Sequence, residues 1–286
     1  MNVLRRAIRG QPCRTVTHSS PMKPRRLHTL HRPAVGTTSS GHLIFVHGGY
    51  ATAGCWNEYF LPWFSRQGFD CHALDLSGHG KSEGRERLDS FGIDDYAQDL
   101  AQVAEDLDEP AVLIGHSMGT VVLERFLERH QARAAILMAP VPATGILGAT
   151  MKIALTEPSF FSQQARAIRG EYNEQTLETM REVYYSEETS SEDLMRFAGL
   201  FQAESRRALM DLTLLAMRLA RHRPKLPVLV LGGQSDAVFP PDLLGFTAAR
   251  WHADVAVIPR AGHTLMLDAH WLAAAERMAE WLDRLV

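Results

Sequence analysis

Three residues of this sequence have the types and the chain order that nucleophilic catalysis requires. Ser117 lies at the centre of the segment Gly-His-Ser-Met-Gly, and Asp236 and His263 follow it in that order. A serine hydroxyl becomes a good nucleophile only when a base takes its proton, and the base needs a third group to orient it. The residues therefore predict acyl transfer, with Ser117 as nucleophile, His263 as base and Asp236 as the orienting carboxylate.

The residues around Ser117 also predict how it is presented. The apolar run 111–114 (AVLI) indicates a strand, and the apolar spacing after Gly119 indicates a helix. Where a strand turns sharply into a helix, the corner side chain is exposed above the sheet, provided that small residues such as Gly115 and Gly119 let the two elements approach closely. The N-terminus of such a helix favours negative charge at the reacting centre.

Position, and not residue type, selects Asp236 and His263. Each follows an apolar run that predicts a strand, and active sites of open α/β sheets gather at the carboxyl ends of the strands. Two rival carboxylates fit less well: Asp75 precedes the serine in the chain, and Asp211 lies in a segment of helical character.

Backbone N–H groups must stabilise the oxyanion that forms during acyl transfer. Met118 supplies one as the residue after the nucleophile, and a loop after the first strand supplies the other. We expect Gly49 in that loop, with Tyr50 as the alternative. The nearby histidines are expected to hold loops by hydrogen bonds: His47, His79 and His116. Four apolar or aromatic residues are expected to bind the substrate: Tyr50, Trp56, Phe239 and Met266.

The remaining sequence predicts an α/β fold in which a mostly parallel central sheet is covered by helices on both faces. Apolar runs alternate with amphipathic segments up to Met138 and again from Val228, as in a buried parallel sheet. Residues 27–40 suggest an antiparallel hairpin at one edge. Residues 141–224 hold no strand-like run, and helical spacing occurs at residues 145–155, 174–185 and 192–221. We therefore divide the chain into a core (27–140 and 225–286) and a helical cap (141–224).

Composition narrows the class of protein and its surroundings. The net charge of −3 gives no reason to expect a nucleic-acid partner, and no stretch is apolar and long enough to span a membrane. Three cysteines, none in a CxxC pair, predict neither a disulfide framework nor a zinc site and favour a reducing compartment. Residues 1–26 are basic and lack acidic residues. They indicate a disordered tail in a cytoplasmic protein or, alternatively, a transit peptide that leads to an organelle matrix.

From about His42 to its C-terminus the chain resembles the α/β-hydrolase superfamily. The segment 75–84 (DLSGHGKSEG), the following Ser90-Phe91 and the pattern from Tyr96 to Leu100 are similar to monoacylglycerol lipases and lysophospholipases. The resemblance implies a cap at residues 141–224 and places Ser117, Asp236 and His263 at the triad positions of that superfamily. Thr120 departs from these lipases, which commonly carry glycine there.

These observations predict a serine hydrolase that cleaves carboxylic esters through an acyl-enzyme and needs no metal or organic cofactor. The expected substrate is a small ester with an apolar short- to medium-chain acyl group, or one like a monoacylglycerol or lysophospholipid. Two alternatives stay open. One is a thioesterase or carbon–carbon bond hydrolase with the same triad, and the other is a non-catalytic ligand receptor on this fold. The sequence leaves acyl chain length, leaving group and oligomeric state open.

Overall fold

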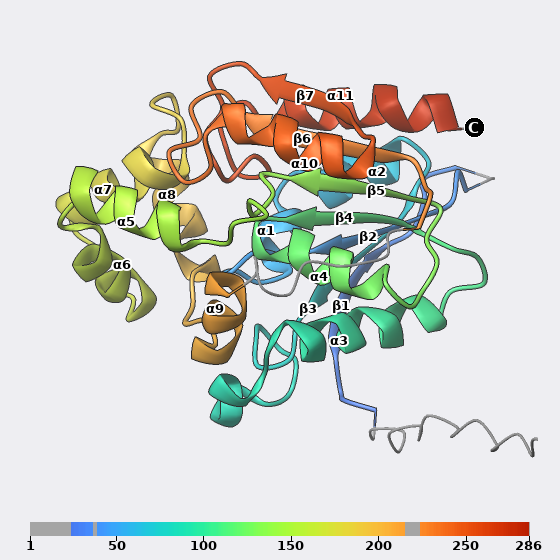
Figure 1. The fold of residues 1–286 in the computed structure, drawn as a ribbon, viewed down its shortest axis with the longest axis horizontal. Coiled ribbons are helices and arrows are strands. Elements are labelled where there is room, and N and C mark those ends of the chain that lie inside the picture. Colours follow the sequence, from blue (N-terminus) through green and yellow to red (C-terminus); the bar gives the residue numbers. More distant parts are fainter. Residues whose placement is uncertain (1–23, 37–38, 215–223, 286) are drawn as a thin grey trace, which may run out of the picture.

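A computed structural model describes residues 24–36, 39–214 and 224–285 of the chain. Within them one sheet has the strand order β1-β3-β2-β4-β5-β6-β7, and every neighbouring pair from β3 to β7 is parallel (Figure 1). The expectation of a mostly parallel sheet is confirmed. The strands are β1 (His28–Arg32), β2 (His42–Val46), β3 (Asp70–Asp75), β4 (Val112–His116), β5 (Ala134–Met138), β6 (Val228–Gly233) and β7 (Asp254–Ile258).

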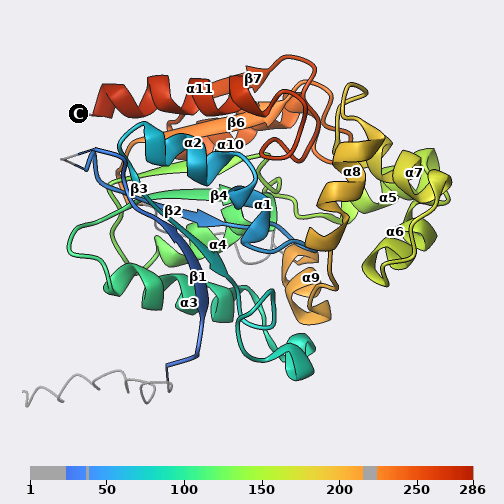
Figure 2. The ribbon, with the colours of Figure 1, turned by 180° about the vertical axis from the view of Figure 1, so that it is seen from behind.

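Helices cover both faces of the sheet, as the continuous apolar runs of the strands require. In β2, Leu43 and Phe45 pack into one hydrophobic core, whereas Ile44 and Val46 pack into the other. The first core includes residues of α1 (Gly54–Asn57), α2 (Phe60–Arg66) and α11 (Trp271–Leu282). The second includes residues of α3 (Ile93–Glu105), α4 (Met118–Phe126) and α10 (Leu244–Trp251), and Figures 1 and 2 show the molecule from opposite sides.

The N-terminal edge of the sheet differs from the hairpin that the sequence suggested. Strand β1 pairs antiparallel with β3 and not with β2, its neighbour in sequence. The folded part also begins earlier than the expected boundary at residue 27. Arg25 donates hydrogen bonds from its guanidinium to the carboxylates of Asp95 and Asp99, at 2.9 and 2.7 Å, and so fixes the chain to α3. The rest of the predicted tail, up to residue 23, lies outside the described residues.

Between β5 and β6 the chain forms a group of helices at one end of the sheet, on the left of Figure 1. We call residues 146–214 the helical insertion. Three of its helices start at a side chain that accepts a hydrogen bond from the backbone three residues on: Asn173, Ser190 and Ser205. Its helices are α5 (Leu147–Thr156), α6 (Phe160–Ile168), α7 (Glu174–Tyr184), α8 (Ser191–Phe197) and α9 (Arg206–Thr213).

The insertion differs from the sequence expectation in two places. The helix α6 was not predicted. The helical stretch expected over residues 192–221 is divided into α8 and α9, and its last part, from residue 215, lies outside the described residues. Among the described helices, none is both long and apolar enough to cross a membrane.

Candidate active site

Ser117 lies at the corner between β4 and α4, in a backbone conformation that residues other than glycine rarely adopt. Its φ of 49° and ψ of −119° lie outside both helix and strand geometry, which costs about 1–3 kcal/mol. The flanking glycines make the corner possible. A Cβ on Gly115 would lie 2.7 Å from the carbonyl oxygen of Gly119, and a Cβ on Gly119 would lie 2.5 Å from that of Val46. The sharp turn predicted from the five-residue segment is therefore present.

Asp236 and His263 form a buried hydrogen-bonded pair in the loops after β6 and β7. The Nδ1 atom of His263 lies 2.8 Å from Oδ2 of Asp236, and the two residues are 3% and 4% exposed. The other carboxylate oxygen, Oδ1, accepts the backbone N–H groups of Val238 and Phe239, both at 2.8 Å. Because these bonds occupy Oδ1, the carboxylate is held with Oδ2 toward the imidazole.

The serine and the histidine line the same pocket, which lies between the carboxyl ends of the strands and the helical insertion. The three residues selected by chain order are thus brought together from β4, β6 and β7. The rival Asp75 has a different use: its carboxylate accepts the backbone N–H groups of Ala53 and Lys81.

The loop after β2 runs close beside Ser117. A Cβ on Gly48 would lie 2.8 Å from Nδ1 of His116 and 3.1 Å from Cβ of Ser117, so only glycine allows this approach. The next residues, Gly49 and Tyr50, line the pocket together with Met118. The backbone N–H of Tyr50, however, points to the carboxylate of Glu204 at 3.3 Å. Of the two expected oxyanion donors in this loop, Tyr50 is therefore already bound elsewhere.

His47 and His116 brace these loops. Nε2 of His47 accepts the N–H of Leu76 at 3.2 Å, so the proton is on Nδ1, which lies 2.8 Å from the Gly48 carbonyl. Burial, followed by the charge of His79, lowers the pKa of His47 to about 4. Nε2 of His116 lies 3.0 Å from the carbonyl oxygen of His263, and burial holds its pKa well below the ordinary value. Both imidazole rings are therefore uncharged at neutral pH and hold these loops by hydrogen bonds.

Glu204 is the main residue of the site that the sequence did not reveal. It lies in the insertion between α8 and α9, and its side chain is fully buried behind the loop of Gly49. Oε2 is 3.0 Å from Nε2 of His79 and also accepts the N–H of Tyr50. Oε1 accepts the hydroxyl of Tyr96 at 2.9 Å and the backbone N–H of Ser205 at 2.7 Å. One carboxylate therefore joins the insertion, the glycine loop and α3.

The pKa shifts of this pair favour its charged form. Burial acts to lower the pKa of His79, but the charge and hydrogen bond of Glu204 outweigh it, so the pKa is raised. Burial likewise acts to raise the pKa of Glu204, but the charge of His79, together with the hydrogen bonds from His79, Ser205 and Tyr96, outweighs it, so the pKa is lowered. No local pattern could have found the pair, because its members are 125 residues apart in sequence.

The insertion is also attached to the loop that carries the histidine. The backbone N–H of Thr264 donates to the carbonyl of Tyr184 at 2.8 Å, at the end of α7. Asp268 accepts the N–H groups of Ser186 and Gly262, at 2.7 and 3.1 Å. Because these bonds cross from the insertion to the sheet, α7 and the His263 loop are fixed to each other.

The pocket wall is mostly apolar, and half of its lining residues come from the insertion. No Asp, Glu, Lys or Arg is among the described residues that line it. The few polar groups include Gln164, whose amide donates to the Tyr184 hydroxyl at 2.9 Å. Residues of the insertion on the wall include Ile146, Ile153, Phe160, Phe161, Leu209 and Leu212.

Of the four residues expected to bind substrate, Tyr50, Phe239 and Met266 line the pocket. Trp56 does not, and that expectation is corrected. Its side chain is fully buried in the core under α1, with its ring 5.1 Å from that of Phe45. The helical spacing that made Trp56 a candidate reflects the face of α1 that packs on the sheet.

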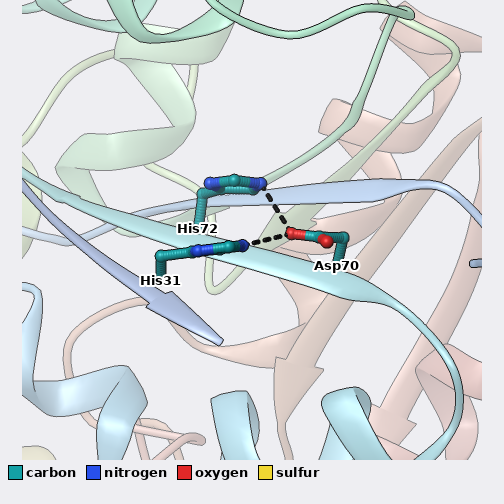
Figure 3. A group of neighbouring side chains, drawn as sticks. All are labelled: His31, Asp70 and His72. Carbon is teal, nitrogen blue, oxygen red and sulfur yellow. Dashed lines mark hydrogen bonds and ion pairs between the residues drawn. The ribbon is translucent and has the colours of Figure 1, made fainter. Parts of the chain in front are cut away.

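The described residues around the pocket offer no cluster of donors for a metal ion. Within the described chain, one group of three His, Cys, Asp or Glu residues has ligand atoms close enough for that: His31, Asp70 and His72 (Figure 3). Asp70 opens β3. The group therefore lies at the amino end of that strand, away from the carboxyl ends that carry Ser117 and His263.

Known proteins resemble this chain in sequence and in fold. A sequence model of the alpha/beta hydrolase family matches residues 43–275. The chain is 24% identical over 157 residues to a pyrethroid hydrolase of Sphingobium wenxiniae, a match that covers 50% of this chain and 54% of that protein. It is 37% identical over 84 residues to protein phosphatase methylesterase 1 of Bos taurus, with 28% and 22% covered. The chain thus spans about half the length, or less, of these curated relatives.

Among solved structures, a soluble variant of monoglyceride lipase from Saccharomyces cerevisiae, in complex with a substrate analog, has a TM-score of 0.72. The alignment covers 93% of this chain and 94% of that chain at 14% identity, which shows a shared fold. The fold class expected from the sequence is confirmed. Since the family model covers most of the sheet and the corner at Ser117, the chain belongs to the alpha/beta hydrolase family.

Proposed function

We propose that this protein is a serine hydrolase that cleaves carboxylic esters with an apolar acyl group through an acyl-enzyme. The observation that carries the proposal is the juxtaposition of the strained Ser117 corner and the buried Asp236–His263 pair on one pocket. The relatives named as hydrolase and methylesterase agree with ester cleavage.

The hydrogen bond to Asp236 supports a role for His263 as the general base. When Nδ1–H donates to the carboxylate, Nε2 keeps its lone pair and accepts the proton of the serine hydroxyl as Oγ attacks the carbonyl carbon. The imidazolium then protonates the leaving alcohol, and the ester C–O bond breaks. In the second half, the same nitrogen takes a proton from water as the water oxygen bonds to the acyl carbon. The bond from that carbon to Oγ of Ser117 then breaks, and the imidazolium returns the proton to Oγ, which releases the acid.

Two backbone N–H groups stabilise the oxyanion in this mechanism. Met118 opens α4, where the N–H groups of the first turn have no partner within the helix. Gly49 is the second donor, because the N–H of Tyr50 is taken by Glu204. Glu204 acts as a positioning residue, since it holds the loop on which Gly49 lies.

The uncharged wall of the pocket supports an apolar acyl group. A carboxylate or phosphate inside it would lose its hydration without meeting a cation among the described lining residues. This favours simple esters over substrates that carry a charged group next to the reacting carbonyl. Gln164 and Tyr184, the polar pair on the wall, could bind an oxygen atom of the substrate that lies farther from the reacting carbonyl.

Activity-based labelling tests the proposal directly. A fluorophosphonate should label the wild type at Ser117, and the protein should hydrolyse nitrophenyl esters of short to medium chain length. Ser117→Ala should lose the label and about 10⁶-fold of kcat. Ser235→Ala, a change at an exposed serine, should behave like the wild type. Labelling with turnover of acyl-CoA alone would support a thioesterase instead. Tight ligand binding without labelling would support the receptor alternative.

A further inference from the structure

A second cluster of chemically capable side chains lies at the amino end of the sheet. The Nε2 atoms of His31 and His72 are 2.5 and 3.0 Å from the same oxygen, Oδ1 of Asp70. The two imidazole rings are stacked, with centroids 4.5 Å apart and 12° between their planes, so both nitrogens point the same way (Figure 3). Two imidazole lone-pair positions and one carboxylate thus converge on one point.

A third histidine completes the group. Nδ1 of His42 lies 3.3 Å from Nε2 of His72 and 3.9 Å from Oδ1 of Asp70. The other nitrogen of His42, Nε2, is 2.8 Å from Oδ1 of Asp108. When Nε2–H donates to that carboxylate, Nδ1 carries a lone pair directed at the cluster. A carboxylate behind an imidazole is the arrangement that orients histidine ligands in metal sites.

We propose that His31, Asp70, His72 and His42 form a binding site for a zinc ion. Three imidazoles and one carboxylate are a donor set suited to zinc and unsuited to magnesium or calcium, which take oxygen ligands. The ion takes the position near Oδ1 of Asp70 to which the imidazole nitrogens point. The carboxylate of Asp70 then withdraws from this position by about 2 Å, the length of a zinc–oxygen bond, and binds the ion on the side opposite the imidazoles. The His31 side chain is half exposed, which leaves a path from solvent.

The ion would join three strands, because His31 lies in β1, His42 in β2 and the other two ligands in β3. Strand β1 is the antiparallel edge of the sheet, and His31 faces His72 in its register. Zinc therefore fastens the edge strand to the parallel core. No local pattern predicts this site, since the cysteines lack zinc spacing and its three histidines are separated by 11 residues or more.

Calorimetric titration of zinc into the full chain, prepared without a histidine tag and stripped with a chelator, tests the site. The wild type should bind one zinc per chain and melt at a higher temperature with zinc. His31→Ala and Asp70→Asn should each weaken binding at least tenfold. Asp108→Asn changes an exposed residue and should weaken it about tenfold through His42.

His252→Asn is the matched control. His252 is exposed, lies at the end of α10, and has a φ of 51° that asparagine tolerates, so its zinc binding should equal that of the wild type. Absence of stoichiometric binding to the wild type would overturn the proposal, and so would unchanged binding in both His31→Ala and Asp70→Asn. The cluster would then be a group of hydrogen-bonded histidines only. Circular dichroism of each variant separates loss of the site from loss of the fold.

Discussion

The two halves of the candidate site are built differently. The half on the sheet carries Ser117, Asp236 and His263, and every residue of β4 and β6 is buried. The half on the insertion carries much of the pocket wall, and in α5 only Ile153 is buried. The proposed catalytic groups therefore follow strands fixed by two hydrophobic cores, whereas part of the pocket wall, including Ile153 and Phe160, belongs to a smaller third core. We therefore expect the proposed chemistry and the choice of substrate to vary separately, except where hydrogen bonds connect the two halves.

After the loss of Ser117 itself, the largest effect on turnover is expected in the sheet half, from Asp236→Asn. The backbone N–H groups of Val238 and Phe239 keep the amide oxygen, so the NH₂ group faces Nδ1 of His263. The imidazole proton then moves to Nε2 and the base is lost. We expect kcat to fall about 10⁴-fold with KM little changed. Asp242→Asn, an exposed change in the same loop, is the control. Near-normal turnover by Asp236→Asn would exclude this carboxylate as the orienting group.

Acid should destabilise the sheet half. The unfolded state binds protons at its histidines below about pH 6.5, whereas folded His47 stays neutral down to about pH 4. Protons in that window therefore favour the unfolded state, and stability is lost as the pH falls from 6.5 to 4. His47 alone accounts for about 3 kcal/mol. The buried His116, whose pKa is also lowered, acts in the same direction.

Urea denaturation at several pH values between 7.5 and 4 measures this loss. His47→Gln keeps an acceptor for the Leu76 N–H and should flatten the slope of stability against pH, even if its stability at pH 7.5 is lower. His130→Gln, at a partly buried histidine just after α4, is the control. An equal slope in the wild type and His47→Gln would refute the assignment of the effect to His47. His79 acts above this window, since its raised pKa gives stability that is lost as the pH rises through that pKa.

Glu204→Gln breaks the connection between the halves. Both carboxylate oxygens accept two hydrogen bonds, so the amide NH₂ must face donors in either orientation. The loop of Gly49 should shift, and kcat should fall about 100-fold while KM changes little, as for loss of an oxyanion donor. Glu188→Gln, at a partly exposed carboxylate of the insertion, is the control. A rise in KM with unchanged kcat would assign Glu204 to substrate binding instead.

The smallest effect is expected in the insertion half, from Ile146→Trp. Ile146 lines the pocket, so the larger side chain should shorten it. We expect kcat/KM to fall about tenfold for medium-chain esters and to stay unchanged for acetate esters. Leu155→Trp, at a position 80% exposed on the same segment, is the control. A uniform fall for all chain lengths would mean that Ile146 supports the catalytic groups and not the wall.

The sheet half could be predicted from the sequence because its signals are local. Buried strands give continuous apolar runs, and the corner at Ser117 needs glycines within two residues of it. The insertion half gave weaker signals. Glu204, just before the start of α9, meets His79 and Tyr96, which lie more than a hundred residues away in sequence, so no local pattern could predict its contacts. The placement of Trp56 failed for a related reason, since core and pocket residues have the same apolar spacing.

The hydrogen bonds that attach α7 to the His263 loop have a consequence for protein engineering. An exchange of the whole insertion for that of a relative would remove the carbonyl of Tyr184 and the N–H of Ser186. The N–H of Thr264, next to His263, would then lose its acceptor, and Asp268 would lose one of its backbone donors. A graft that keeps residues 184–186 and Glu204, and replaces only α5 and α6, would alter the pocket wall. It would preserve the hydrogen bonds between the insertion and the loops of the sheet.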